Sequence, residues 1–369
     1  MKNFYHKIRE YIPIVPLVIF IFTIISAILY IIYINSVTFA DFMNYNLSAP
    51  FRMIISFTTS IIPFSIAEML ILLSPLWIAL LIYLAIKFGK MGKKQSIRYL
   101  CVLLSILCFI FIAYAWTYTS GYHNTPIEDK MELNRENIDK NELYDTSVII
   151  IDNLNKLANE ITYDENKASQ MEYSYYTMSA KICDAYSKFV KKHPIIRTFW
   201  SNVKPLIISE PMTYTHLSGI YSFMTGEANV NVNYPDFIVA TSSAHEMAHQ
   251  RGVAREDEAN FIAFAVLSGS DDAFLKYSAY LDVFSYVISD LRKADKELYK
   301  EAISSLDIRV REDYNSYVEF FQKYANSTAS EVTDKINNSY LQANGQISGT
   351  KSYAMVSELV CAYLLNRTK

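Results

Sequence analysis

The chain has 369 residues, of which 51% are hydrophobic, and a formal net charge of −3 at pH 7. Charge is unevenly distributed: residues 1–98 carry nine Lys or Arg and three acidic residues, whereas the rest of the chain is acidic and contains no basic stripe of the kind that binds nucleic acid. The hydrophobic surplus lies in the first third, so the composition predicts a membrane part followed by a water-soluble part.

Three apolar runs in the first third predict transmembrane helices at about 12–34, 66–86 and 99–118. Each run is close to the length of about 20 apolar residues that crosses a lipid bilayer. The first run is too long for a signal peptide and no small-residue cleavage site follows it, so we expect an uncleaved membrane anchor. The stretch from Met53 to Ile66 is shorter and contains Pro63, which favours an interfacial or re-entrant segment.

The distribution of basic residues predicts the orientation of these spans. The basic residues gather before the first span and between the second and third, at Lys2, Lys7, Arg9, Lys87, Lys90, Lys93, Lys94 and Arg98. The positive-inside rule places both segments in the cytoplasm. We therefore expect a multi-pass protein of the cell membrane, with a membrane domain over 1–119 and an extracytoplasmic domain over 120–369.

The second domain is long enough to bury one sizeable core. The spacing of apolar residues predicts helices over 139–163 and 170–191. Between Val203 and Tyr234, proline and glycine separate short β-prone pieces, and helical patterns resume near Asp236 and continue to the end. These patterns predict a mainly helical α+β domain.

The residues that carry chemistry stand at 245–249, which read H-E-x-x-H. Residues four apart lie on one face of a helix, so His245 and His249 can bind the same zinc ion. The carboxylate between them, Glu246, then reaches the metal-bound water and acts as general base. The motif predicts one Zn²⁺ per chain; the alternative is a helix with two surface histidines. The four cysteines form no C-x-x-C, which argues against a thiolate zinc site.

The sequence around the motif favours a helix. Asp236 follows Pro235 and is a suitable N-cap, and Gly252 stands where a glycine typically ends a helix. Phe237 to Arg251 contains no helix breaker. The two histidines are therefore expected on a single uninterrupted helix.

A catalytic zinc needs a third protein ligand and an open position. The position of the third metzincin histidine is occupied by Arg255, so the nearest candidates are Glu256, Asp257 and Glu258. Acidic residues in a first helical turn also stabilise the helix dipole, which is the alternative role for all three. Glu256 and Glu258 point to opposite sides of a helix, so only one ligand is expected. The apolar residues that follow Glu258 favour it only weakly.

A family resemblance bears on this choice. Glu258-Ala259-Asn260 resembles the E-A-N or E-A-D signature of gluzincin metallopeptidases, including families that cleave phage repressors or act in the bacterial radiation response. The resemblance implies that Glu258 ligates the zinc and that Asn260 supports the site.

A longer resemblance links the chain to a family of bacterial membrane proteins, domain of unknown function 3810. The matching segments are Lys204-Pro205, Ser218 to Tyr221, Thr225 to Asn231, His245 to Gly252 and Glu256 to Phe261. This resemblance implies N-terminal spans and a zincin-like C-terminal domain, but no particular substrate. The expected fold is therefore a multi-pass α-helical membrane region followed by a mainly helical α+β zincin-like metallopeptidase domain.

Two further features complete the expected site. The segment Gly226-Glu227-Ala228-Asn229-Val230-Asn231 is expected to form or border an edge strand to which a substrate strand adds, although an ordinary turn and strand would have the same pattern. Tyr353 is a candidate oxyanion donor. His123 and His216 are lone histidines, and we expect neither to be a ligand.

The features together predict a zinc metallopeptidase anchored in the lipid bilayer, which hydrolyses a peptide or protein substrate with a zinc-activated water. The alternative is a non-catalytic, membrane-tethered zincin-like binding or scaffold module. Glu246 favours the peptidase, because a purely structural zinc site has no need of that carboxylate.

Overall fold

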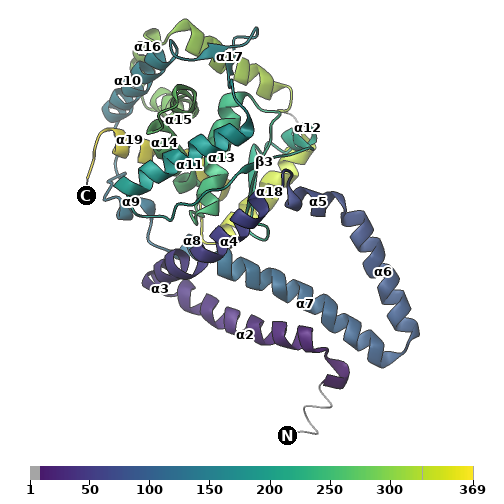
Figure 1. Ribbon diagram of the computed structural model, residues 1–369. Coiled ribbons are helices and arrows are strands. Elements are labelled where there is room, and N and C mark those ends of the chain that lie inside the picture. Colours follow the sequence, from purple (N-terminus) through teal and green to yellow (C-terminus); the bar gives the residue numbers. More distant parts are fainter. Residues whose placement is uncertain (1–8, 326, 369) are drawn as a thin grey trace.

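A computed structural model describes residues 9–325 and 327–368, and Figure 1 shows long helices projecting from one side of a compact helical domain. The projecting helices are α2 (Ile14–Ile34), α6 (Ser74–Lys90) and α7 (Lys93–Thr117), with the short α5 (Ile66–Leu72) before α6. Helices α2 and α7 are each long and apolar enough to cross a membrane. These two helices indicate a membrane protein.

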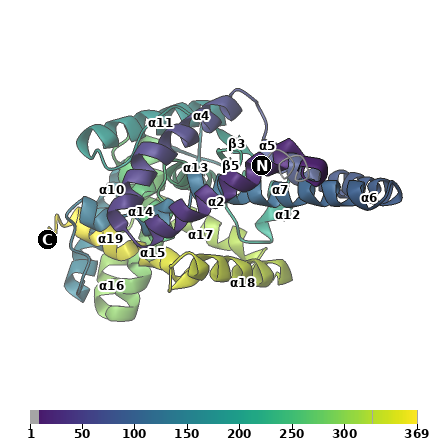
Figure 2. The ribbon, with the colours of Figure 1, turned by 90° about the horizontal axis from the view of Figure 1, so that it is seen from below.

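The expected second span is broken into two helices. Helices α5 and α6 together satisfy the length and hydropathy of a span, but they meet at a bend of 57°. Pro75 occupies the first turn of α6, where its ring prevents α5 from continuing through it. The described residues therefore contain two candidate spans, or three if the bent pair counts as one. Figure 2 shows α6 and α7 reaching well beyond the domain.

Between α2 and α5 the chain forms α3 (Val37–Phe42), a π-helix η1 (Met43–Ser48) and α4 (Ala49–Ser60). Helix α4 turns its polar face to the domain. There Ser56 donates a hydrogen bond to the carbonyl of Gly226 at 2.8 Å. The buried Arg52 donates hydrogen bonds to the carbonyls of Thr117 at the end of α7 and Asn44 in η1, both at 2.9 Å. The opposite face exposes large apolar side chains, namely Phe51, Ile54, Phe57 and Ile61. Such an amphipathic helix fits the interfacial interpretation of this stretch.

The domain is built around two helices that carry the motif residues. Helices α13 (Asp236–Gln250) and α14 (Glu256–Ser268) are buried on nearly all faces. Around them stand α8 (Ser120–His123), α9 (Ile127–Lys130), α10 (Lys140–Leu157), α11 (Tyr175–Lys192), α12 (Ser209–Thr213), α15 (Ala273–Ala294), α16 (Lys296–Ser304), α17 (Ile308–Gln322), α18 (Thr328–Ala343), the 3₁₀ helix η2 (Gly349–Met355) and α19 (Val356–Leu364). All four cysteines lie in the described residues and are free thiols, so Cys183 and Cys361 do not pair.

The helices expected over 139–163 and 170–191 are α10 and α11, and both are shorter than predicted. A two-stranded ladder of β1 (Thr162–Tyr163) and β2 (Ser169–Gln170) lies between them. The turn of this hairpin is stabilised by Asp164, whose side chain accepts hydrogen bonds from the backbone N–H groups of Asn166 and Ala168. Local side-chain bonds of this kind compete with a helix, and the segment between α10 and α11 forms a hairpin in place of the predicted helical turns.

A three-stranded sheet packs against α13. Its strands are β3 (Val203–Pro205), β4 (Gly219–Ser222) and β5 (Glu227–Val230), in the order β3-β5-β4, with β3 parallel and β4 antiparallel to β5. The segment 226–231 therefore borders an edge strand and does not form one, because β5 lies in the middle of the sheet. Its four residues are all buried, which is typical of a central strand. The edge strand beside α13 is β4.

Candidate metal centre

Helix α13 holds the motif, and its two ends explain its placement. It begins at Asp236 after Pro235, and the Asp236 carboxylate accepts a hydrogen bond from the backbone of Met171 rather than capping its own helix. It ends at Gln250, and two residues later stands Gly252, whose φ of +95° favours glycine. A Cβ at Gly252 would also lie 2.3 Å from the guanidinium of Arg52. The predicted helix is thus present, with its start displaced by one residue.

Three ligand atoms converge beside this helix. His245 Nε2 and His249 Nε2 lie 3.2 and 3.3 Å from the same oxygen, Glu256 Oε2, and all three atoms lie within 4.8 Å of one another. A tetrahedral zinc with bonds of about 2.0 Å would hold its nitrogen and oxygen ligands about 3.3 Å apart. Glu256 Oε2 is buried and makes no hydrogen bond to a described residue. The donor set and its spacing therefore fit one zinc ion.

Neighbouring groups orient His249 and keep Glu256 ionised, as binding of a cation requires. His249 Nδ1 lies 2.7 Å from the carbonyl oxygen of Val253, so Nδ1 carries a proton and Nε2 is the ring atom that faces Glu256 and would bind a metal. Burial raises the pKa of Glu256, but the two histidines outweigh it, and this pKa lies well below its ordinary range. Glu256 is accordingly an ionised carboxylate, as a metal ligand must be.

Glu246 lies beside the edge strand. A Cβ built on Gly219 would come within 2.6 Å of Glu246 Oε1, so only glycine leaves room for this carboxylate. Burial raises the pKa of Glu246, while the positive charge of His245 and His249 opposes the shift. A carboxylate with a raised pKa is well suited to accept and return a proton near neutral pH.

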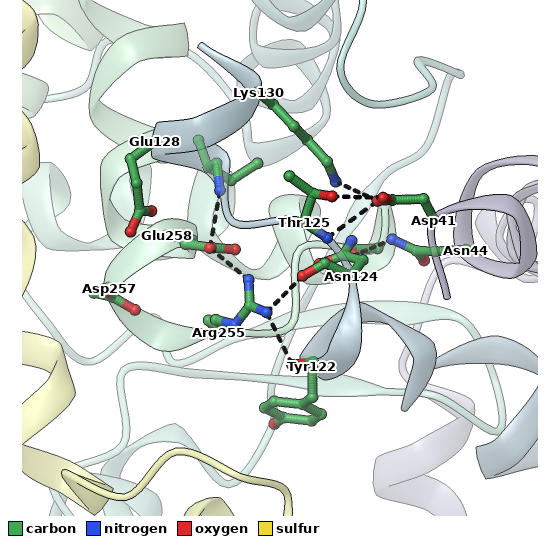
Figure 3. Close-up of polar contacts among 12 residues, drawn as sticks. Asp41, Asn44, Tyr122, Asn124, Thr125, Glu128, Lys130, Arg255, Asp257 and Glu258 are labelled. Carbon is green, nitrogen blue, oxygen red and sulfur yellow. Dashed lines mark hydrogen bonds and ion pairs between the residues drawn. The ribbon is translucent and has the colours of Figure 1, made fainter. Parts of the chain in front are cut away.

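Glu258 is placed away from the histidines. Its carboxylate accepts a hydrogen bond from the Arg255 guanidinium at 2.7 Å (Figure 3) and another from the backbone N–H of Ile127 at 3.0 Å. Asp257 pairs with Arg135 at 2.8 Å. The structure therefore brings Glu256 to the histidine pair, in place of the expected Glu258. Two residues apart on a helix is a rotation of about 200°, so only one of the two glutamates can face α13.

One feature of the sequence could have distinguished Glu256 from Glu258 as the residue that faces the two histidines. Periodicity is uninformative on α14, because this helix is buried on almost every side. The residues four and seven positions after Glu256, however, are Asn260 and Ala263, and both line the cavity beside His245. A polar and a small residue on the same face as Glu256 indicate the side of α14 that borders the cavity.

That cavity has a volume of about 410 Å³, and its wall includes Glu246 and Tyr353. Asn260 donates a hydrogen bond to the Tyr353 carbonyl at 3.4 Å, and the Tyr353 ring lies 6.5 Å from that of His245, centroid to centroid. Burial raises the pKa of Tyr353 well above its ordinary value, so its hydroxyl keeps its proton. Both residues are thus at the site, as expected, and their roles stay predictions.

Other residues at the site were not anticipated from the sequence. Tyr118, one residue beyond α7, places its hydroxyl 3.4 Å from His249 Nδ1. Asp282 of α15 lines the cavity, and burial raises its pKa to about 6. His216 also lines the cavity but is outside the metal cluster, and its Nε2 lies 2.9 Å from the Tyr324 carbonyl oxygen. Nothing in the linear sequence brings Tyr118 or Asp282 near residue 245.

Comparison with known proteins gives one match. A family described as Protein of unknown function (DUF3810) matches residues 43–361, from η1 to α19. No curated protein and no solved structure matches the chain. The matched span covers most of the chain, including the candidate metal centre and α5, α6 and α7.

Proposed function

The chain belongs to the DUF3810 family, and we propose that it is a membrane-anchored zinc metallopeptidase of gluzincin type. The observation that carries the proposal is the spacing of three ligand atoms, from His245, His249 and Glu256, at the distances that a tetrahedral zinc requires. Beside them lies the Glu246 carboxylate on the wall of a cavity. A bound zinc would lower the pKa of its water to about 7 and polarise the scissile carbonyl.

The protein groups have distinct roles in this proposal. Glu246 accepts the proton of the attacking water and transfers it to the leaving amine. Tyr353, which keeps its hydroxyl proton, donates a hydrogen bond to the developing oxyanion. The outer edge of β4 binds the substrate as an added strand. Asn260 supports the site from the face of α14 that also carries Glu256.

The alternative is a membrane-tethered scaffold that keeps a zincin-like shape. Structural zinc sites are closed by four protein ligands, whereas the described residues supply a cluster of three and leave a position for water. Gly219 leaves space for a carboxylate that a scaffold does not need. A short mixed sheet packed on the H-E-x-x-H helix, with the third ligand on the next helix, is consistent with a zincin-like domain. These features favour the peptidase.

Metal analysis of the purified full-length protein in detergent tests the proposal. We expect one zinc per chain and cleavage of members of a randomised peptide library, with cleavage lost on chelation and restored by added zinc. A protein that binds no zinc, or a zinc-loaded protein that cleaves no peptide in any format, would overturn the proposal.

The proposal also places the domain outside the cytoplasm. The basic loop before α7 favours a cytoplasmic position, so a reporter fused after residue 125 should be active only outside the cytoplasmic membrane. A fusion of the same reporter after Gly92, in the loop between α6 and α7, is the matched control and should be inactive, because this loop is expected in the cytoplasm. A cytoplasmic signal from the fusion at residue 125 would show that the orientation is reversed.

A further inference from the structure

The candidate metal centre is built directly on the end of a membrane helix. Tyr118 follows the last residue of α7, and its ring lies 6.0 Å from that of His249, centroid to centroid. Because α7 is long and apolar enough to span the bilayer, its end at the domain lies near the membrane surface. The metal ligand His249 therefore lies about one tyrosine side chain from the end of this helix.

A second set of contacts fixes the position of the domain relative to the membrane helices. Asn44 donates a hydrogen bond to the carbonyl of Gly252 at 2.9 Å, and Arg52 donates one to the carbonyl of Arg251 at 3.4 Å. Both carbonyls lie just beyond the end of the motif helix α13. Figure 3 shows a further link, in which Asp41 of α3 accepts a hydrogen bond from Thr125. The segment that joins α2 to α5 is thus bonded to the domain beside the metal centre.

The outer face of α4 indicates where the bilayer surface lies. Phe57 is exposed on that face and its ring lies 6.4 Å from that of Trp200 in the domain, centroid to centroid. Together with Ile54 these residues form an apolar surface shared by α4 and the domain. A half-apolar helix between two membrane segments lies in the interface plane with its apolar side in the lipid. The domain is therefore seated on the membrane and does not hang from a flexible linker.

The edge strand connects this surface to the catalytic carboxylate. Strand β4 begins at Gly219, beside Glu246, and the turn that follows it contacts α7. In that turn the Phe223 ring lies 5.2 Å from the Tyr114 ring, and the Phe223 carbonyl accepts a hydrogen bond from Thr117 at 3.3 Å. At about 3.4 Å per residue, the four steps from Gly219 to Phe223 span about 14 Å.

We propose that the substrate is a polypeptide anchored in the same membrane by a transmembrane helix, cleaved within about five residues of the bilayer surface. This inference rests on the proposed peptidase activity. A substrate strand added to the outer edge of β4 follows that strand, so one end of the bound segment lies beside α7 near the lipid surface. The length of strand β4 sets the number of substrate residues between the membrane surface and Glu246.

The test compares the cleavage of substrates whose cleavable segment lies at different heights above the membrane. Full-length protein is reconstituted in liposomes with substrates that carry a randomised eight-residue window next to an apolar transmembrane helix. In one substrate the window begins directly at the bilayer surface, and in the other a rigid helical spacer of 20 residues raises it by about 30 Å. The same window is also supplied as a free peptide, and products are identified by mass spectrometry.

We expect the window at the surface to be cleaved at least ten times faster than the raised one, with cuts concentrated within about five residues of the membrane. Equal cleavage of the two anchored substrates, with the free peptide also cleaved, would overturn the inference and leave the peptidase standing. Absence of cleavage in all three formats by zinc-loaded protein would overturn the proposed function, and the inference with it.

Discussion

Replacing Glu246 with glutamine should lower peptide hydrolysis by about 10²–10⁴-fold, the usual cost of removing a positioned general base. Glutamine has nearly the shape of glutamate, so it fits the space left by Gly219 and should not disturb His245 or His249. It cannot accept a proton from water at neutral pH. The zinc content and thermal unfolding temperature of Glu246→Gln should therefore match those of the unchanged protein, and only the rate of cleavage should fall.

The matched control is the same chemical change at a distant site. Glu297 lies in the first turn of α16 and its side chain is 82% exposed, so Glu297→Gln should leave cleavage unchanged. A Glu246→Gln protein that keeps zinc and cleaves as fast as the Glu297→Gln protein would rule out the proposed mechanism. A scaffold is indifferent to the change at Glu246, so unchanged biological function in that variant would support the non-catalytic alternative.

The features that the sequence predicted well depend on local patterns. The two spans α2 and α7 follow from hydropathy, and α13 follows from i, i+4 spacing and a terminal Gly252. Two features require glycine at position 252. Its φ of +95° is unfavourable for other residues, and a side chain would collide with Arg52. Local rules of this kind need no knowledge of distant residues.

The features that were missed depend on contacts between distant residues. Which of β4 and β5 lies at the edge depends on β3, which pairs with β5 from more than 20 positions earlier in the chain. The approach of Tyr118 to His249 joins residues 131 positions apart. The break between α5 and α6 is different, because Ser74-Pro75 was a visible local signal inside an otherwise apolar run.

The proposed third ligand, Glu256, gives the second large effect that we expect. Glu256→Ala should weaken zinc binding by at least about 100-fold, since changing even a residue that only supports a ligand typically costs 10–100-fold in metal affinity. Binding is measured by competition with a chromogenic zinc chelator, with the folded fraction checked by thermal unfolding. His245→Ala and His249→Ala should lose zinc in the same assay.

Glu258→Ala should behave in the opposite way. Its carboxylate accepts hydrogen bonds from Arg255 and from the backbone of Ile127, so removal leaves two donors without this partner at a cost of about 1–3 kcal/mol each. The variant should unfold at a lower temperature but bind zinc with unchanged affinity, and Glu258→Gln, which can still accept both hydrogen bonds, should recover part of the stability. If Glu258→Ala lost zinc while Glu256→Ala kept it, the metal would be held from the opposite face of α14, and the cluster of His245, His249 and Glu256 would be an ion pair without a metal role.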